Sequence, residues 1–404
     1  MNINFKKTAA LFFSVVAGIN LAHSQSTGES NLLGQINTIT TAVPFLMISP
    51  DARAGGMGDA GVASSPDANS IAWNASKLAF MEKNFGASIS YTPWLRQLVN
   101  DINLSYVSVY RKLKKDQTIG MSLRYFSLGQ IDFTGTAGEP LGTANPNEFA
   151  FDLAYARKLS EKFSGGIALR YIHSDLTNGY GVGAEATSAG TSVAADITGY
   201  YQSPITVSKK DAVLAIGMAI TNIGSKISYT STGDKDFIPI NLRLGPSLKL
   251  KLNDYNELTF LLDINKLLVP TPPVYSDSVV NGTQLILFGQ SSDVSVPAGM
   301  IQSFSDAPGG FSEEIKEFNL CGGMEYWYDK QFAFRAGYFF ESATKGNRKY
   351  FTLGAGVKYS VFGLDFAYLI PTEQRNPLEN TLRFSLTFDF DASKGGSSEE
   401  ETTE

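Results

Sequence analysis

Large apolar residues recur at every second position in a succession of short segments that begins near residue 84. The last segment, TLRFSLTFDF, places Leu382, Phe384, Leu386, Phe388 and Phe390 on one face, and polar residues alternate with them. A period of two is the period of a β-strand. Large apolar groups on one face with small or charged groups on the other are typical of a strand between lipid and a polar lumen. The pattern therefore predicts an all-β protein built as a transmembrane barrel.

Fourteen segments of this kind follow one another, and bacterial single-chain barrels have an even number of strands. They cover residues 84–92, 101–112, 117–129, 147–158, 164–174, 191–202, 211–221, 240–252, 256–264, 318–328, 331–341, 349–359, 361–370 and 381–390. Connections after even-numbered segments are mostly short, as at 113–116 and 329–330, whereas those after odd-numbered segments are generally longer, as at 222–239 and 265–317. This alternation predicts about 14 antiparallel strands in an up-and-down barrel with one elaborated rim. A secreted β-sandwich, the alternative, has no reason to follow it.

The start of the chain has the features of an export signal. A basic MNINFKK precedes the apolar TAALFFSVVAGINLA, and Ala22 and Ser24 are small residues at the expected cleavage positions before Gln25. The apolar run is too short to span a membrane as a helix. We therefore expect an integral outer-membrane protein. Its expected parts are a signal peptide at 1–24, an N-terminal segment with a small lumenal plug at 25–83, the barrel at 84–390, and a disordered acidic tail at 391–404.

Charge and composition remove several classes of function. The net charge is −6, and removing Lys6 and Lys7 with the leader moves it to about −8, which argues against nucleic-acid binding. Cys321 is the only cysteine and His173 the only histidine after the leader, so we expect no disulfide framework, no histidine metal site and no cofactor. Aromatic residues are 12 % of the chain and charged residues only 18 %, which fits a membrane barrel.

The stretch FLMISPDARAGGMGDAG contains Gly56, Gly58 and Gly61 in the spacing G-x-G-x-x-G, with Asp59 between them. A dinucleotide-binding turn needs this motif between a strand and a long helix. Here it leads into VASSPDANS, which opposes a long helix, and no alternating strand–helix pattern follows. We interpret the glycines as packing residues of a compact plug. A short helix through Trp73 follows, and we place Asn74 in the same plug.

Two stretches resemble one protein family. Residues 51–79, DARAGGMGDAGVASSPDANSIAWNASKLA, are similar to the N-terminal region of the PorV and PorQ proteins. Residues 90–110, SYTPWLRQLVNDINLSYVSVY, resemble PorV more specifically through Pro93-Trp94-Leu95 and Asp101-Ile-Asn103-Leu104. These proteins are outer-membrane components of the type IX secretion system and relatives of the FadL long-chain fatty-acid transporters. The resemblance implies a FadL-like barrel of fourteen strands, in agreement with the count of segments.

The resemblance also implies a role that is not enzymatic. PorV receives cargo with a conserved C-terminal signal domain at the translocon barrel SprA, also called Sov. It delivers this cargo to the cell-surface attachment complex of the sortase-like PorU with PorZ and PorQ. For this chain we accordingly expect long loops outside the cell, and short turns and the C-terminal tail in the periplasm.

The longest connection, 265–317, offers candidate contacts for such partners because loops of this length are usually functional or disordered. Its first part is KLLVPTPPVY, in which apolar residues alternate with prolines that limit the entropy lost on ordering. We predict a semi-rigid apolar arm; the alternative is that this stretch folds back over the barrel mouth. Trp94 and Leu95 lie at the same rim, where Trp94 is more simply explained as a girdle residue. The arm residues are Leu267, Leu268, Val269, Pro270, Pro272, Pro273, Val274 and Tyr275.

A FadL-like transporter and an enzyme are the two alternative functions. A FadL-like transporter of long-chain fatty acids or other hydrophobic small molecules needs an apolar lumenal pocket and a route past the plug. An enzyme needs a nucleophile, a base and an orienting group within reach of each other. The letters HSD at 173–175 are adjacent on a strand and point to opposite faces, and no G-x-S-x-G is present, so we expect no enzyme. Four basic residues face the predicted lumen, where they suit structural ion pairs, an acidic plug or a lipid carboxylate: Arg124, Arg170, Lys358 and Arg383.

Overall fold

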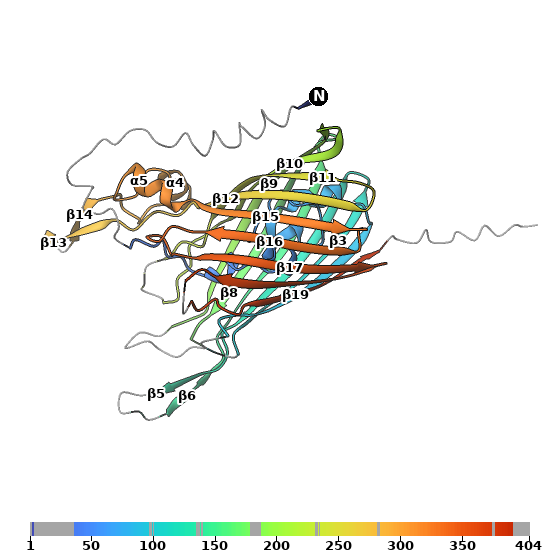
Figure 1. The fold of residues 1–404 in the computed structure, drawn as a ribbon. Helices are drawn as coiled ribbons and strands as arrows, with labels where there is room; N and C mark the ends of the chain where they lie inside the picture. Colours follow the sequence, from blue (N-terminus) through green and yellow to red (C-terminus); the bar gives the residue numbers. More distant parts are fainter. Residues whose placement is uncertain are drawn as a thin grey trace, which may run out of the picture.

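The computed structural model describes residues 2–3, 36–96, 99, 101–134, 138, 140–177, 187–230, 233, 235–280, 283–373 and 376–390. Fourteen long strands form one barrel, seen from the side in Figure 1, and the two-residue strand β1 (Asn2–Ile3) adds to the end of one of them. The barrel strands are β2 (Phe85–Pro93), β3 (Asn103–Lys114), β4 (Gln117–Ser127), β7 (Asn147–Lys158), β8 (Phe163–Asp175), β9 (Gly190–Val207), β10 (Lys210–Gly224), β11 (Asn241–Lys251), β12 (Asn256–Leu267), β15 (Asn319–Tyr328), β16 (Phe332–Phe340), β17 (Lys349–Tyr359), β18 (Phe362–Pro371) and β19 (Leu382–Phe390).

The barrel closes between its first and last strands. β19 pairs with β2 from Phe384↔Tyr91 to Phe390↔Phe85, and each barrel strand is antiparallel to its neighbours. Closure leaves no open strand edge, which a hydrocarbon surrounding would not tolerate. The prediction of a fourteen-stranded antiparallel barrel is therefore confirmed. The strand ends differ from the predicted ones by a few residues, most of all in β9, which continues past 202 to Val207.

The two faces of the strands differ as the alternation predicts. On β7, Phe151 and Leu153 are 44 % and 47 % exposed, whereas Asp152 and Ala154 between them are 2 % and 1 % exposed. The outer surface of the barrel is thus apolar, and the inward side chains pack against one another and against the plug. This is the arrangement that a lipid bilayer requires of a spanning strand.

The two rims are unequal. Short hairpin turns close one rim, and the pairs Ser208–Lys209 and Asp329–Lys330 both have positive φ, as two-residue turns between twisted strands require. The opposite rim carries two small hairpins and three short helices, which the sequence did not predict. These are β5 (Ile131–Thr134) with β6 (Pro140–Ala144), β13 (Val274–Val280) with β14 (Thr283–Phe288), α4 (Val296–Gln302), α5 (Phe311–Glu314) and the 3-10 helix η4 (Ile315–Glu317).

The N-terminal segment fills the lumen with short elements: η2 (Pro44–Met47), α2 (Ala52–Gly55), α3 (Ser70–Trp73) and η3 (Ala75–Phe80). It begins at the elaborated rim, where the N–H of Ala42 donates to the carbonyl of Phe237 over 2.9 Å. It then crosses the lumen to the short-turn rim, where β2 begins at Phe85. Within the described ranges, no helix has the length and hydrophobicity needed to cross a membrane.

Candidate functional site

The glycine motif packs the plug against the wall. Gly58 has φ +68°, and a Cβ at this position would lie 2.6 Å from the backbone N of Tyr338 and 2.8 Å from the carbonyl O of Gly322. A Cβ on Gly61 would lie 2.5 Å from the ring of Trp73. Gly58 therefore packs against the wall and Gly61 against Trp73 of the plug itself, and neither position has room for a side chain. The motif is followed by no long helix, because α2 ends at Gly55 and α3 has four residues, so the geometry matches plug packing rather than a dinucleotide turn.

One buried network of charges ties the plug to the wall. Arg53 on α2 donates to both carboxylate oxygens of Glu325 on β15, over 2.9 and 2.8 Å, and to Asp67 over 2.8 Å. Arg335 on β16 donates to the same Glu325 and to Asp365 on β18, both over 2.7 Å. Such bidentate contacts are strong because both partners are charged and shielded from water. The network joins the plug to three strands.

A second set of contacts involves the glycine loop itself. Asp59 accepts from Arg383 over 2.9 Å and from the hydroxyl of Tyr350 over 2.6 Å. The carboxylate of Asp263 on β12 accepts the backbone N–H groups of Gly61 and Val62 over 2.7 and 2.8 Å. The side-chain amide of Asn74 donates to the carbonyls of Val62 and Gly199. The predicted plug residues thus lie together in the lumen, held from opposite sides of the barrel.

Two ionisable groups lie fully inside the plug. Asp51 accepts from the N–H of Ala54 over 2.9 Å and from the indole N–H of Trp73 over 2.6 Å. Burial raises the pKa of Asp51 to about 6, and the nearby Asp67 adds to this rise. Burial lowers the pKa of Lys77, whose ammonium donates to the carbonyl of Gly61 and to Ser64, to about 8.

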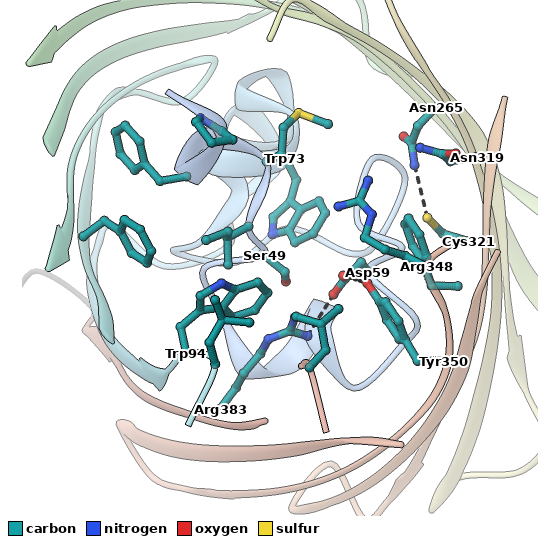
Figure 2. A pocket seen from close by; sticks show the side chains of 18 of the residues that line it. Ser49, Asp59, Trp73, Trp94, Asn265, Asn319, Cys321, Arg348, Tyr350 and Arg383 are labelled. Atoms are coloured by element: carbon teal, nitrogen blue, oxygen red, sulfur yellow. Dashed lines mark hydrogen bonds and ion pairs between the residues drawn. The ribbon is translucent and has the colours of Figure 1, made fainter. Parts of the chain in front are cut away.

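A cavity of about 340 Å³ lies beside the plug, toward the elaborated rim (Figure 2). Its lining is mostly apolar and includes Phe45 and Trp94. Arg243 is a basic group on this lining; it donates to Asn265 over 2.8 Å and stacks 4.6 Å from the ring centroid of Trp73. Trp94 is half-buried and packs within the barrel mouth, so the girdle position that we favoured for it is wrong. Trp94 directly follows β2, and its ring lines the lumenal cavity.

The other basic side chains in the lumen contact groups of the protein. Arg170 pairs with Asp152 over 2.6 Å and with Asp196 over 3.1 Å, both on the wall. Arg124 donates to the carbonyl of Leu46 over 2.6 Å, and Lys358 pairs with Asp389 over 3.1 Å. Ion pairs therefore account for Arg170, Lys358 and Arg383, whereas Arg124 donates to a backbone carbonyl of the plug. Among the described residues, no group of three or more His, Cys, Asp and Glu is placed to hold a metal ion.

A compact unit, which we call the cap, lies at the end of β12 and β15 and consists of α4, α5 and η4, residues 296–317 (Figure 1). Its glutamates are buried. Lys266 pairs with Glu314 over 3.3 Å and with Glu317 over 2.6 Å, and Lys345 pairs with Glu313 and Glu317 over 2.5 and 2.9 Å. The cap is thereby locked to β12 and to the β16–β17 connection.

The structure divides the predicted arm into two parts. Leu268 and Val269 are 4 % and 2 % exposed and join the apolar cluster at the mouth with Phe45 and Phe237, as our alternative of a stretch folded over the mouth predicts. Pro270 is also buried, while Leu267, Pro272, Pro273, Val274 and Leu95 are half-buried. Tyr275, at the start of β13, is 47 % exposed. The exposed part of this connection is therefore further along the chain than the prolines.

Sequence reasoning missed several residues that hold the site together. Asp263, Glu325 and Arg335 were not singled out, although the period of two places each on the inward face of its strand. Lys266 and Lys345 were missed as well, and no local signal marks them, because their glutamate partners come from a separate segment. A charged residue at an inward position of a barrel strand was the signal available for the first three.

A family model described as "Type IX secretion system protein PorV" matches residues 32–274. No match to a curated protein was found. The toluene transporter TbuX of Ralstonia pickettii aligns at 10 % identity over 85 % of this chain and 99 % of its own, with a TM-score of 0.46. A FadL homologue of Pseudomonas aeruginosa aligns at 11 % identity over 88 % and 100 %, with a TM-score of 0.42. These scores lie below 0.5, so we draw no functional argument from them.

Proposed function

The chain belongs to the PorV family of type IX secretion system proteins, and on this premise we propose that it is a cargo shuttle of the outer membrane. It binds the C-terminal signal domain of secreted proteins at the translocon and passes them to the attachment complex on the cell surface. The expected partners are the SprA (Sov) barrel, and PorU, PorZ and PorQ. The elaborated rim faces the outside, and the short turns and the C-terminal tail face the periplasm. No enzymatic step is required of the protein.

One observation above all supports this proposal: the β13–β14 hairpin projects from the rim (Figure 1), and its side chains are apolar on both faces. Leu285, Ile286 and Leu287 are 50 %, 38 % and 57 % exposed, and consecutive strand residues point to opposite sides. A free two-stranded hairpin with two apolar faces is poorly stable in water. Such an element fits a role in which another protein covers it, by strand addition or by apolar contact.

The proposal is tested by removing the β13–β14 hairpin and, separately, a matched hairpin. Residues 275–288 are replaced by a short Gly-Ser linker, which leaves the buried Leu268 and Val269 in place. The control replaces the other rim hairpin, residues 131–144, in the same way. We expect loss of the large translocon barrel and of cargo from detergent pull-downs of the first variant only. Equal recovery with both variants, each shown to be a heat-modifiable barrel, contradicts the β13–β14 hairpin as the contact.

Transport of a hydrophobic small molecule is a second candidate, because the lumenal cavity has the size of a ligand pocket and a basic group at its wall. Arg243 contacts the neutral groups of Asn265 and Trp73 and interacts electrostatically with the buried Asp263, so a ligand carboxylate would share this cation with Asp263. We expect an Arg243→Leu variant to lose binding of a labelled fatty acid if this function is real. Absence of any binding by the parent protein rules the function out.

A further inference from the structure

In the cap, charged residues are buried and large apolar residues are exposed, which is the reverse of the usual arrangement. Glu313, Glu314 and Glu317 are 7 %, 5 % and 5 % exposed, whereas Phe311 and Ile315 between and before them are 80 % and 38 % exposed. Glutamates are almost never fully buried, and large apolar residues usually are. A short helical segment with charges inside and apolar groups outside is suited to surroundings that are themselves apolar.

The exposed apolar residues form a stripe that continues onto the barrel. The exposed Phe311 and Ile315 are four residues apart, as on one face of a helix, and the half-buried Phe318 follows three residues later against Lys266. β15 begins at Asn319, and Leu320, 41 % exposed, points outward with Met324, 41 % exposed, further along the strand. The stripe therefore passes from helical spacing into strand spacing without a break.

The neighbouring helix adds to the same surface. On α4, Val296 and Met300 pack against the mouth cluster, while Ile301 is 77 % exposed and Phe304, after the helix, is 49 % exposed. Phe304 lies 5.7 Å from the ammonium of Lys266. Lys266 occupies an outward position on β12, because Asp263 and Asn265 point into the lumen, and yet it is only 1 % exposed. The cap thus covers part of the outer face of the wall.

From these observations we propose that the cap is a membrane-seated element, and that Ile301, Phe304, Phe311 and Ile315 lie in the lipid of the leaflet nearest the elaborated rim. Lipid is the occupant because the stripe is continuous with the outer face of β15, which the barrel already presents to the bilayer. The ion pairs of Lys266 and Lys345 allow this placement, since they withdraw the glutamates from the same surface. The inference rests on the barrel and not on the proposed cargo function.

The test measures where the cap lies with spin labels on single cysteines. The native Cys321 is fully buried and does not compete for the label. Labels at Phe311→Cys and Ile301→Cys are compared in nanodiscs with Leu320→Cys, a lipid-facing reference, and Ser291→Cys, an exposed polar reference on the same connection. Each variant is measured with dissolved oxygen, which enters lipid, and with a water-soluble nickel chelate.

We expect positions 301 and 311 to be more accessible to oxygen than to the nickel chelate, with the same sign of the ratio as position 320 and the opposite sign from 291. Ratios like that of 291 at both cap positions would overturn the proposal. Water-like ratios in nanodiscs that change to shielding from both reagents when secretion partners copurify would also overturn it and would assign the stripe to a protein. Two cap positions keep the test decisive if one variant does not fold.

Discussion

The plug and the cap are both non-strand segments attached to the same barrel. Both form buried ion pairs with the wall, but the plug buries its apolar residues and the cap exposes them. In each, buried arginines or lysines hold carboxylates from another part of the chain, as Arg53 holds Glu325 and Lys266 holds Glu317. The plug, enclosed by the wall, also buries its apolar residues, and Met57 and Leu78 are 1 % and 0 % exposed. The cap, attached on one side only, leaves Phe311 80 % exposed.

The difference is whether contacts within the chain cover the apolar surface of the segment. The plug has partners on every side, so its contacts account for nearly all of its polar and apolar groups. The cap pairs its glutamates with two lysines of the barrel, Lys266 and Lys345, and leaves an apolar surface for something outside the chain. Substitutions in the plug should therefore change stability, whereas the exposed face of the cap should matter for placement in the membrane. The following substitutions test that separation.

The largest effect is expected from Arg53→Met. Removing one partner of a buried charge pair costs about 3–5 kcal/mol. Here Asp67 loses its cation and Glu325 keeps only Arg335. We expect hydrogen exchange of residues 51–62 to rise sharply, while the barrel strands remain protected. The control is Lys251→Met, which removes the exposed pair with Asp254 (2.9 Å) on a short turn and should change nothing measurable. Equal exchange in both variants would show that the charge network does not hold the plug.

The corresponding substitution beneath the cap, Lys266→Met on β12, is expected to cost somewhat less, about 3 kcal/mol. Lys266 donates two hydrogen bonds to carboxylates, whereas Arg53 donates three. The effect of Lys266→Met should be confined to the cap, because the wall strand keeps its backbone pairing with β11 and β15. Hydrogen exchange of residues 296–317 should rise without a change in residues 51–62. A simultaneous rise in both segments would mean that plug and cap unfold together, which would remove the distinction between them.

A backbone substitution isolates close packing from charge. Gly58→Ala introduces a Cβ into a positive-φ position that is crowded by wall backbone, and we expect a cost of about 1–3 kcal/mol. Gly138 is the matched control: its φ is +82° and a Cβ there would meet nothing within 4 Å. Thermal unfolding of the two alanine variants should differ, with Gly138→Ala closer to the parent. Identical midpoints would mean that the wall relaxes around the plug.

The barrel could be predicted from the sequence because a period of two is a local property that each strand shows by itself. All fourteen strands, β2 to β19 without the two rim hairpins, appear in the alternation. The glycines of the plug could also be singled out, since a crowded lumen favours them. Their partners could not, because Gly58 meets strands that begin more than two hundred residues later and only the closed barrel brings them together.

The rim was the less predictable part, for a physical reason. Apolar residues in a loop look the same whether they fold inward, as Leu268 does, or project, as Leu287 does. Trp94 illustrates the same ambiguity between girdle and lumen. The burial of Glu313, Glu314 and Glu317 contradicts the usual preference of the residue type, and it depends on two lysines from other elements.

The smallest effect concerns pH. The pKa of Asp51 in the plug is raised from 3.8 to about 6, so the folded protein holds this proton in a range where the unfolded chain releases it. Stability should therefore rise as pH falls through that window, by about 1 kcal/mol per such group between pH 7 and pH 5. Other carboxylates titrate too, so the measurement is the difference between the parent and Asp51→Asn in their midpoints of thermal unfolding at the two pH values.

The same measurement can be made in the cap with Asp306, whose carboxylate accepts the backbone N–H of Thr271. Burial raises its pKa to about 6 as well. If the cap opens independently of the barrel, Asp306→Asn should leave the pH dependence of global unfolding unchanged and alter only the exchange of residues 296–317. Asp51→Asn should instead reduce the global dependence, because the plug is enclosed by the wall. A reversed pattern would mean that the cap, and not the plug, is part of the cooperative unit with the barrel.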